Sequence, residues 1–481
     1  MNFTSIAFYC LFISCIISLG LLQKIKGKNS ISLYTIILVI CSIVFCGWQD
    51  WKFAAIIIVE SIFAYFMAIK ISQTQKKIFL IIGVCVNLGF LGIFKYYNFF
   101  VDTIGFFYVS LKKINLFLPL GISFYTFSAI GYLIDVYRKK YMPEKNIFNV
   151  ILYMSFFPKL TAGPIISADK FLEQLKKVEQ KITLTNIGEG LQIILQGLIK
   201  KNVFADHIGE FVNIVYSNVT MYNMPTLLLA ILGYGVQIYF DFSGYSDIAI
   251  GCSKCLGFTM PTNFNLPYLS RNITEFWKRW HITLSDWLMN YLYIPLGGNR
   301  KGHIRTFINL FLTMVIGGLW HGASWNFVLW GALHGIALCI HKQFMKTKKI
   351  SKDFVPSLPK FIMGVLGTYL FTNFCWIFFR ITDIRVIGQL LYRIGTCSTG
   401  VAFYSWWTII GIGFMIISTS ITIMKNFWNQ KREKCNYTSI QAFYVKKDLS
   451  KFRNLVLFFF LIGLVIGLAY ADSNPFIYAA F

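Results

Sequence analysis

Long apolar runs separated by short polar segments make up most of this 481-residue chain. The runs lie near 4–23, 31–49, 53–71, 78–95, 115–136, 147–166, 186–199, 211–240, 306–341, 361–379, 404–424 and 454–470. About 20 apolar residues are enough for a helix to cross a bilayer. The pattern therefore predicts an all-α integral membrane protein that forms a single membrane domain over residues 1–481.

Two of the runs do not fit a simple crossing. Pro158 and the Gly163–Pro164 pair interrupt the run 147–166, and basic clusters flank it on both sides. These features favour a re-entrant segment that enters and leaves the membrane on the same side.

The run 306–341 is too long for one crossing and contains no Asp, Glu, Lys or Arg. As one helix its 36 residues would extend about 54 Å, beyond a hydrocarbon core of about 30 Å. We predict a bend at Gly317–Gly318 or at Gly322, which leaves both ends of the run on the cytoplasmic side.

Composition supports the membrane assignment, because 56% of the residues are hydrophobic and only 14% are charged, with a mean hydropathy of +0.60. The net charge of +25 does not indicate nucleic-acid binding, because the basic residues form short clusters between apolar runs. Such clusters are typical of cytoplasmic loops. The largest lies in residues 425–453, which we predict to be a cytoplasmic loop, followed by a last span and an extracytoplasmic tail in 454–481. No basic residue precedes the first run, so we expect the N-terminus outside as well.

The eleven cysteines form neither a disulfide framework nor a zinc motif. Most lie inside apolar runs, where cysteine behaves as a small hydrophobic residue. The CSKC sequence at 252–255 has no second Cys or His pair at zinc-site spacing. We therefore predict no metal site.

Candidate chemistry centres on two histidines. His321 lies in the middle of the uncharged run 306–341, within GLWHGASWNFVLWGALHG, and His281 lies 40 residues earlier, within EFWKRWHITLSDW. Ionisable residues at membrane depth are uncommon and usually line a polar cavity or pathway. His334 and His341 follow on one helix face, but no carboxylate or thiolate accompanies them, so we interpret these two as packing or interfacial residues.

The segment around His281 is amphipathic. Its apolar stripe consists of Trp277, Trp280, Leu284, Trp287 and Tyr291, at helical spacing. Asn272 and Glu275 resemble a capping box, so we predict a helix that starts near residue 273. A helix of this kind lies along the cytoplasmic interface, which places His281 near a cytoplasmic mouth.

The sequence YFDFSGYSD places Asp241 and Asp247 at or near membrane depth. Polar groups here could line a cavity. We favour a simpler interpretation, in which Gly244 breaks the helix and the two carboxylates bind freed backbone amides or loop arginines.

Several longer motifs together resemble the membrane-bound O-acyltransferase family. They are FYTFSAIGYLIDVYR, YMSFFPKLTAGPI, YFDFSGYSDIAIG, NFNLPYLSRNITEFWKRWHITLSDWLMNYLYIPLGGNRKG and GLWHGASWNFVLWGALHG. Within this family, the motifs are most similar to the branch that contains the alginate and peptidoglycan O-acetyltransferase membrane subunits. The resemblance extends from about residue 121 to 341, and it implies a catalytic core over 115–345.

This resemblance implies a ring of tilted and re-entrant helices around a central tunnel, which joins a cytoplasmic donor site to an extracytoplasmic acceptor side. His321 matches the family's buried active-site histidine, and His281 matches its second, cytoplasmic-side histidine. A neutral imidazole in such a tunnel acts either as a general base or as a short-lived acyl carrier. The sequence leaves both roles open.

The C-terminal sequence ADSNPFIYAAF resembles an FxYxxF tail of this family, formed here by Phe476, Tyr478 and Phe481. The resemblance implies that Tyr478 relays the acyl group to an extracytoplasmic partner. An aromatic tail could also simply anchor the last helix at the interface.

Five basic residues near the predicted cytoplasmic mouth are candidates for binding the phosphates of acetyl-CoA, although topology alone also explains them. They are Lys278, Arg279, Arg300, Lys301 and Arg305. The leading hypothesis is a multi-pass protein of the bacterial cytoplasmic membrane, with both termini extracytoplasmic. It would pass acetyl from acetyl-CoA to a cell-surface polysaccharide through a separate acyltransferase, which the family suggests is of the SGNH type. D-alanyl transfer to teichoic acid and transport without bond chemistry are the alternatives.

Overall fold

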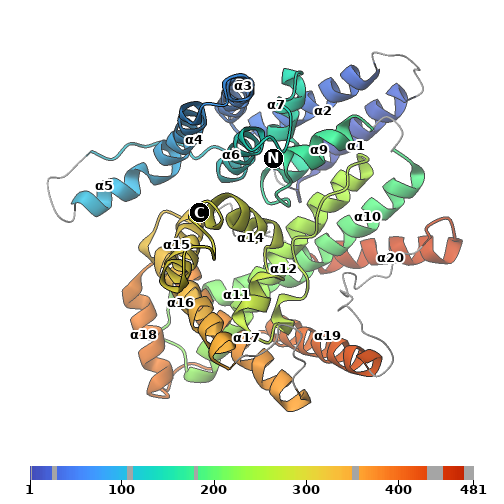
Figure 1. Ribbon diagram of the computed structural model, residues 1–481. Coiled ribbons are helices and arrows are strands. Elements are labelled where there is room, and N and C mark those ends of the chain that lie inside the picture. The colour runs from blue at the N-terminus through green and yellow to red at the C-terminus, as the bar shows by residue number, and fades with distance from the viewer. Residues whose placement is uncertain are drawn as a thin grey trace. The chain divides into compact units, whose positions relative to one another are not determined.

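The computed structural model of the protein describes residues 1, 3–23, 30–105, 112–177, 182–348, 357–430 and 448–470. Within these ranges the chain is helical, and the β pairing consists of one isolated bridge between Tyr222 and Val401. The helices, most of them labelled in Figure 1, are α1 Ile6–Leu22, α2 Ser30–Gly47, α3 Trp51–Thr74, α4 Lys77–Leu91, α5 Tyr97–Gly105, α6 Ile122–Tyr137, α7 Ile147–Ser155, α8 Phe157–Leu160, α9 Ala168–Leu175, α10 Leu184–Leu198, α11 Asp206–Ser217, α12 Met224–Cys255, α13 Ile273–Trp277, α14 Ile282–Leu288, α15 His303–His321, α16 Trp325–Thr347, α17 Leu358–Arg380, α18 Ile384–Gly395, α19 Trp406–Gln430 and α20 Phe452–Leu468. Short π-helical segments cover Gly92–Tyr96, Ile199–Ala205 and Met289–Tyr293.

The predicted all-α membrane architecture is confirmed. In the part of the chain that the structure describes, five helical segments are long and apolar enough to cross a membrane: 51–74, 77–105, 224–255, 303–321 and 358–380. Their outer faces carry apolar side chains such as Leu366, which is 55% exposed. Backbone hydrogen bonds within helices satisfy the peptide groups that hydrocarbon cannot.

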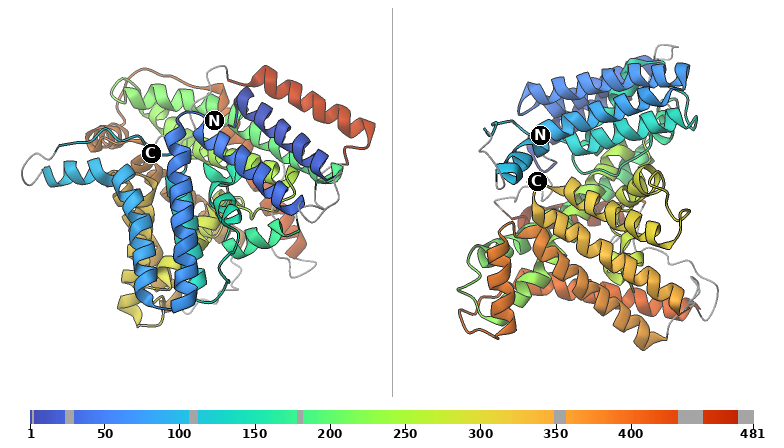
Figure 2. Two further views of the ribbon diagram at one scale, coloured as in Figure 1. Left: turned by 90° about the horizontal axis from the view of Figure 1, so that it is seen from above. Right: turned by 60° about the vertical axis from the view of Figure 1, so that its left-hand side comes forward.

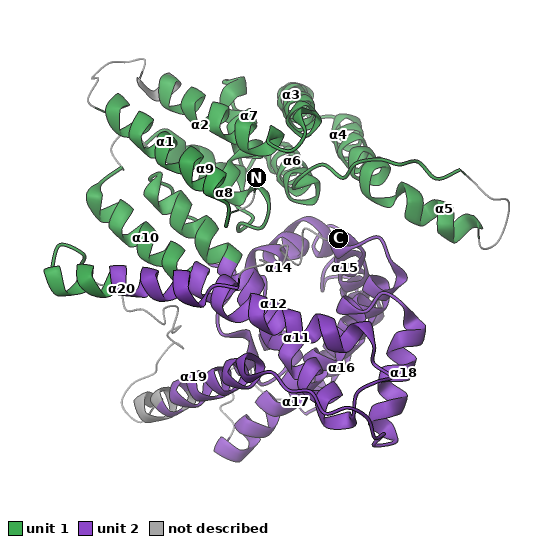
Figure 3. Cartoon of the chain, turned by 180° about the vertical axis from the view of Figure 1, so that it is seen from behind, with its two compact units in different colours: residues 1–197, 245–261, 446–458 green, residues 198–244, 262–445, 459–481 purple. Residues whose placement is uncertain are grey.

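The chain folds into two compact units, coloured separately in Figure 3. Unit 1 consists of residues 1–197, 245–261 and 446–458, and unit 2 consists of residues 198–244, 262–445 and 459–481. Two continuous helices, α12 and α20, contribute residues to both units. The single domain over 1–481, the core over 115–345 and the central tunnel stay predictions.

In unit 1, helices α3, α4 and α6 pack side by side (Figure 2). Thr126 Oγ1 of α6 donates a hydrogen bond of 3.2 Å to Glu60 Oε1 of α3, so a buried carboxylate links the two helices. The predicted interruption of the run 147–166 is confirmed. Helix α7 ends at Ser155, and the four-residue helix α8 carries Pro158 in its first turn, where proline costs no hydrogen bond.

In unit 2, α15 and α16 form an antiparallel hairpin, and α17 packs against α16 (Figure 1). The predicted bend in the run 306–341 is confirmed at the second candidate position, because α15 ends at His321 and α16 starts at Trp325. Ser324 caps α16 by accepting a hydrogen bond of 3.3 Å from the N–H of Asn326.

One expectation about α12 is wrong. Gly244 does not break a helix, because α12 continues through it to Cys255. The run 211–240 is divided between α11 and α12, with a turn between Ser217 and Met224. Helix α12 is 32 residues long, and packing on its sides outweighs the weak helix propensity of a single glycine.

The two acidic residues of α12 are also held differently from what we expected. Lys201 Nζ lies 2.6 Å from Asp241 Oδ1 and 2.8 Å from Asp206 Oδ1, and all three side chains are at most 2% exposed. Asp247 Oδ2 accepts a hydrogen bond of 3.2 Å from Gln196 Nε2. Their partners are thus side chains of neighbouring helices, and the unbroken helix α12 leaves no interior amides free.

Candidate active site

His321 is the last residue of α15 and is 3% exposed. Glycines let the two arms of the hairpin approach closely enough to enclose it. A Cβ on Gly318 would overlap the carbonyl oxygen of Phe327, and a Cβ on Gly331 would overlap that of Met314. The glycines of the GLWHG and LWGALHG motifs are therefore required by space at the α15–α16 contact.

Three aromatic rings from three helices surround the His321 ring. Trp320 of α15 lies 5.0 Å from it, Trp330 of α16 lies 5.1 Å from it, and Phe379 of α17 lies 5.2 Å from it, measured between ring centroids. The ring planes are steeply inclined, at 70°, 90° and 69°. Asn326 Nδ2 fixes the end of α17 by donating to the carbonyl oxygens of Ile381 and Thr382.

His281 lies at a break in the helix that we expected to be continuous. The cap at Asn272 is confirmed, because its Oδ1 accepts a 2.9 Å hydrogen bond from the N–H of Glu275. Helix α13 then ends at Trp277, and α14 begins at Ile282. His281 itself has φ of 44°, in the left-handed region. A non-glycine residue in this region is strained, and such strain concentrates at functional sites.

The side chain of His281 is 0% exposed, so it lies inside the protein. Its expected position near the cytoplasmic mouth stays a prediction. Phe242 of α12 lies 4.7 Å from the ring, perpendicular to it, and Phe264 lies 6.4 Å away. The break in the helix turns His281 inward, among residues that are distant in sequence. This burial lowers the pKa of His281 to about 3, because an imidazolium would lose its hydration there.

Asn263 holds His281 in place, and sequence reasoning missed it. Its Oδ1 lies 3.1 Å from His281 Nδ1 and accepts hydrogen bonds from the hydroxyl of Thr283, at 3.0 Å, and from its N–H, at 3.4 Å. Its backbone carbonyl accepts a fourth, from the N–H of Ile282 at 2.9 Å. Since an amide oxygen only accepts, His281 Nδ1 carries the proton, and the lone pair is on Nε2.

The ring of Trp320 lies close to the rings of both histidines. Its ring centroid lies 6.3 Å from that of His281 and 5.0 Å from that of His321. Among the described residues, His281 Nε2 has no hydrogen-bond partner. Unit 2 thus contains two buried histidines on one tryptophan, one of which presents a lone pair.

The candidate phosphate-binding residues divide into two groups. Arg300, Lys301 and Arg305 are exposed at the start of α15. The end of α16 lies beside them, because Lys342 Nζ donates to Asn299 Oδ1 at 2.7 Å and Lys346 Nζ contacts His303 Nε2. We call these five basic residues, Arg300, Lys301, Arg305, Lys342 and Lys346, the basic end of the hairpin. It is opposite the end that holds His321.

The other two candidates lie near α13. Lys278 is exposed. Arg279 is 9% exposed, and its guanidinium binds the carboxylate of Glu275 at 3.0 Å and the carbonyl oxygen of Asn265 at 3.1 Å. This arginine therefore holds the turn before His281. The remaining candidate, Tyr478, lies outside the described residues.

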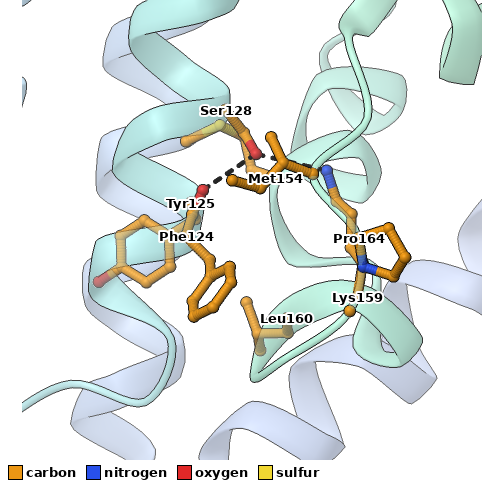
Figure 4. A pocket seen from close by; sticks show the side chains of 9 residues that line it. Phe124, Tyr125, Ser128, Met154, Lys159, Leu160 and Pro164 are labelled. Atoms are coloured by element: carbon orange, nitrogen blue, oxygen red, sulfur yellow. Dashed lines mark hydrogen bonds between the residues drawn. The ribbon is translucent and has the colours of Figure 1, made fainter. Parts of the chain in front are cut away.

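A separate pocket lies in unit 1 (Figure 4), and none of the predicted site residues lines it. Lys159 is 5% exposed there, with Nζ 3.9 Å from the centroid of the Tyr153 ring and 3.5 Å from Ser128 Oγ. The cavity volume is about 10 Å³, which holds about one water molecule. The contacts of Lys159 are those of a buried lysine that an aromatic face stabilises.

Comparison with known proteins identifies the family. The profile of the MBOAT, membrane-bound O-acyltransferase family, matches residues 144–382. A peptidoglycan O-acetyltransferase of Helicobacter pylori is 38% identical over 74% of this chain and 72% of its own length. The chain belongs to the membrane-bound O-acyltransferase family. It is therefore an O-acyltransferase, and its apolar helices make it a multi-pass membrane protein.

Two further relatives of this O-acyltransferase have names that specify different acyl groups. A probable alginate O-acetylase of Pseudomonas aeruginosa is 34% identical over 89% of this chain and 83% of its own length. A teichoic acid D-alanyltransferase of Streptococcus thermophilus is 32% identical, but over 49% of this chain and 59% of its own length. The O-acetylating relatives therefore align over a larger share of this chain than the D-alanyltransferase does.

Proposed function

We propose that this O-acyltransferase moves acetyl from cytoplasmic acetyl-CoA across the membrane for O-acetylation of an extracytoplasmic polysaccharide. The observation that carries the proposal is the pair of buried histidines near Trp320, in a chain that matches O-acetylating proteins over 74% and 89% of its length. The polysaccharide acceptor corresponds to the peptidoglycan and alginate in the names of these relatives.

His321 is the proposed catalytic residue. It is enclosed by aromatic rings at the closed end of the hairpin, where bulk water is excluded. Its imidazole either removes the proton of an incoming hydroxyl or takes the acetyl group itself before passing it on. Both routes conserve one acetyl group, and both transfer one proton from the acceptor to the thiol that leaves.

His281 is the proposed donor-side residue. Its neutral tautomer, with the proton on Nδ1 and a lone pair on Nε2, suits it to accept a hydrogen bond or a proton. Lys278, Arg300, Lys301 and Arg305 are proposed to bind the phosphates of the coenzyme, with Arg279 supporting the turn that precedes His281.

Tyr478 is proposed to receive the acetyl group and to hand it to an extracytoplasmic acyltransferase partner of the SGNH type. A phenyl ester is more activated than an ester of serine, so onward transfer to an aliphatic hydroxyl is downhill. This role requires the C-terminal tail outside the cell and the basic loop of 425–453 inside. It therefore belongs with a location in the bacterial cytoplasmic membrane, with both termini extracytoplasmic.

The proposal is tested by CoA release from acetyl-CoA in proteoliposomes, together with the intact mass of the C-terminal peptide. Wild-type protein should release CoA and gain one acetyl group at Tyr478. His321→Ala should lose both signals, and Tyr478→Phe should lose the added mass. His341→Ala is the matched control, because His341 is half-buried and bonded to Thr274 Oγ1 at 2.8 Å. No CoA release and no added mass with the partner present would reject acetyl-CoA as the donor.

D-alanyl transfer is the second candidate function, because the relatives include teichoic acid D-alanyltransferases. It predicts that the same proteoliposomes consume a D-alanyl thioester on a carrier protein and leave acetyl-CoA intact. Running both donors in parallel separates the two functions.

A further inference from the structure

The carboxylate of Glu275, in α13, binds two arginines at once. Its Oε1 accepts hydrogen bonds from Nε of Arg279 at 3.2 Å and from Nη2 of the same residue at 3.0 Å. Its Oε2 accepts two from Arg271, one from Nε at 2.9 Å and one from the backbone N–H at 3.1 Å. The side chain of Glu275 is 14% exposed, and bonds between arginine and carboxylate are stronger than neutral ones. We call these three residues the carboxylate clamp.

The Arg271 arm of the clamp is fixed against α17. The guanidinium carbon of Arg271 lies 5.8 Å from the centroid of the Phe361 ring. The backbone carbonyl oxygen of Arg271 approaches Gly364 so closely that a Cβ on this glycine would lie 2.7 Å from it. Glycine is the residue that leaves room for such an approach. Arg271 therefore ties the clamp to a helix that is long and apolar enough to cross a membrane.

The Arg279 arm of the clamp reaches the segment that carries Asn263. Nη1 of Arg279 donates to the carbonyl oxygen of Asn265 at 3.1 Å, and the carbonyl oxygen of Arg279 accepts from the N–H of Asn265 at 2.9 Å. The N–H of Ile282 donates to the carbonyl oxygen of Asn263 at 2.9 Å. The segment that carries Asn263 is thus bonded to the chain on both sides of His281.

The backbone and the imidazole of His281 both depend on this support. With φ of 44° the residue lies in the left-handed region, and a strained conformation persists only where the surrounding structure holds it. The tautomer depends on Asn263 Oδ1, because the 3.1 Å bond to this oxygen places the proton on Nδ1. A shift of Asn263 would therefore loosen the turn and weaken the bond that selects the tautomer.

We propose that Glu275 is a positioning residue for His281. Its carboxylate orients Arg279, Arg279 holds the segment of Asn263, and Asn263 keeps the lone pair of His281 on Nε2. Glu275 acts through these two residues and not on the imidazole itself. This inference rests on the proposed function for the part that His281 takes in the reaction.

The first test is a double-mutant cycle on kcat for thiol release from acetyl-CoA in proteoliposomes. Glu275→Gln keeps the shape of the side chain and removes its charge, so it should lower kcat several-fold with little change in KM. Because Glu275 acts through Asn263, the double variant Glu275→Gln with Asn263→Ala should have the kcat of Asn263→Ala alone. Losses that multiply in the double variant would show two independent roles and overturn the inference.

The second test observes His281 by nitrogen NMR of protein with isotope-labelled histidine, and the signals of His281 are assigned by their loss in His281→Gln. Glu275→Gln should raise the share of the tautomer that carries its proton on Nε2. Glu189→Gln is the matched control, because Glu189 also forms an ion pair, 3.1 Å from Lys254 Nζ, and its side chain is 25% exposed. This control should keep the wild-type kcat and the wild-type signals of His281.

Arg279→Lys is used where Glu275→Gln does not fold, because it keeps the charge and loses the fork that spans Glu275 and Asn265. A folded variant whose His281 signals match those of wild type would overturn the inference, whatever its kcat. If the His281 signals depend on the clamp but wild type releases no CoA from acetyl-CoA, the positioning role stands and the acetyl-CoA donor fails. Wild-type CoA release with His281 signals that do not respond to the clamp would leave the proposed function without this inference.

Discussion

The effect on kcat of losing the hydrogen bond between Asn263 and His281 can be predicted in magnitude. The bond is 3.1 Å long and wholly buried, and a bond of this kind contributes about 1–1.5 kcal/mol net. Without it, the preference of His281 for the tautomer with its lone pair on Nε2 falls by a factor of about 5 to 10, since about 1.4 kcal/mol is tenfold. Asn263→Ala should therefore lower kcat, by a factor of at most about 5 to 10.

The replacement Asn263→Asp separates the tautomer from simple loss of packing. A carboxylate at this position still accepts from His281 Nδ1, and a charge-assisted bond is stronger than a neutral one, so kcat should exceed that of Asn263→Ala. Thr283→Val is the matched control, because it removes the 3.0 Å bond to the same oxygen without touching His281. Thr283→Val should reduce stability by about 1 kcal/mol and change kcat less than twofold.

The assay is thiol release from the donor thioester, run beside thermal unfolding of each purified variant. Folded Asn263→Ala with wild-type kcat would refute the role of this bond. Equal loss of kcat in Asn263→Ala and Asn263→Asp, with equal stability, would show that the tautomer of His281 is not what Asn263 controls.

Three other variants test the hairpin packing, the buried ion pairs and the basic end. Gly318→Ala should lower both the unfolding temperature and kcat, because its Cβ would overlap backbone at Phe327, whereas Gly367→Ala, with no heavy atom within 4 Å of the added Cβ, should leave both unchanged. Lys201→Met should destabilise the protein by about 3–5 kcal/mol, since it leaves Asp206 and Asp241 buried without their cation. Substitution of the exposed Lys52 is the control, because its surface ion pair with Asp50 contributes under about 1 kcal/mol to stability. Urea or thermal unfolding measures the difference in stability between the two variants. Arg300→Gln with Arg305→Gln should raise KM several-fold for acetyl-CoA and not for acetyl-pantetheine, which lacks the phosphates; an equal rise for both donors would contradict phosphate binding by these arginines.

The sequence predicted most of the membrane helices, because apolar length alone decides them. The bend at Gly322 was predictable because the 36-residue run 306–341 is too long for one crossing. The interruption of the run 147–166 was predictable from Pro158. Short helices were harder. The amphipathic stripe from Trp277 to Tyr291 predicted one helix, yet the chain turns at His281. Packing of His281 against Phe242, and bonding to Asn263, outweigh the local helical pattern there.

The two histidines of the candidate site could be predicted from the sequence, whereas the residues that contact them could not. The two histidines were found from their place in apolar or aromatic sequence, and the structure brings both rings close to the ring of Trp320, at 6.3 Å and 5.0 Å between centroids. Asn263 was missed because its partner is 18 residues away and a lone asparagine in a loop carries no signal. His334 was interpreted as a packing or interfacial residue, and its full burial among the rings of Phe276, Trp277, Trp330 and Phe371 agrees with packing.

The way the two units share the chain has a consequence for how the protein is made. Unit 1 includes residues 446–458, and Leu449 lies beside Gly188 of α10. A ribosome therefore synthesises all of the intervening chain before unit 1 has all of its segments, and contacts so distant in sequence form slowly. Unit 1 therefore stays incomplete, with its first 197 residues already made, until α20 has been synthesised. Truncations within α20 should act as folding defects of the N-terminal helices, and an N-terminal fragment cannot stand in for the complete unit.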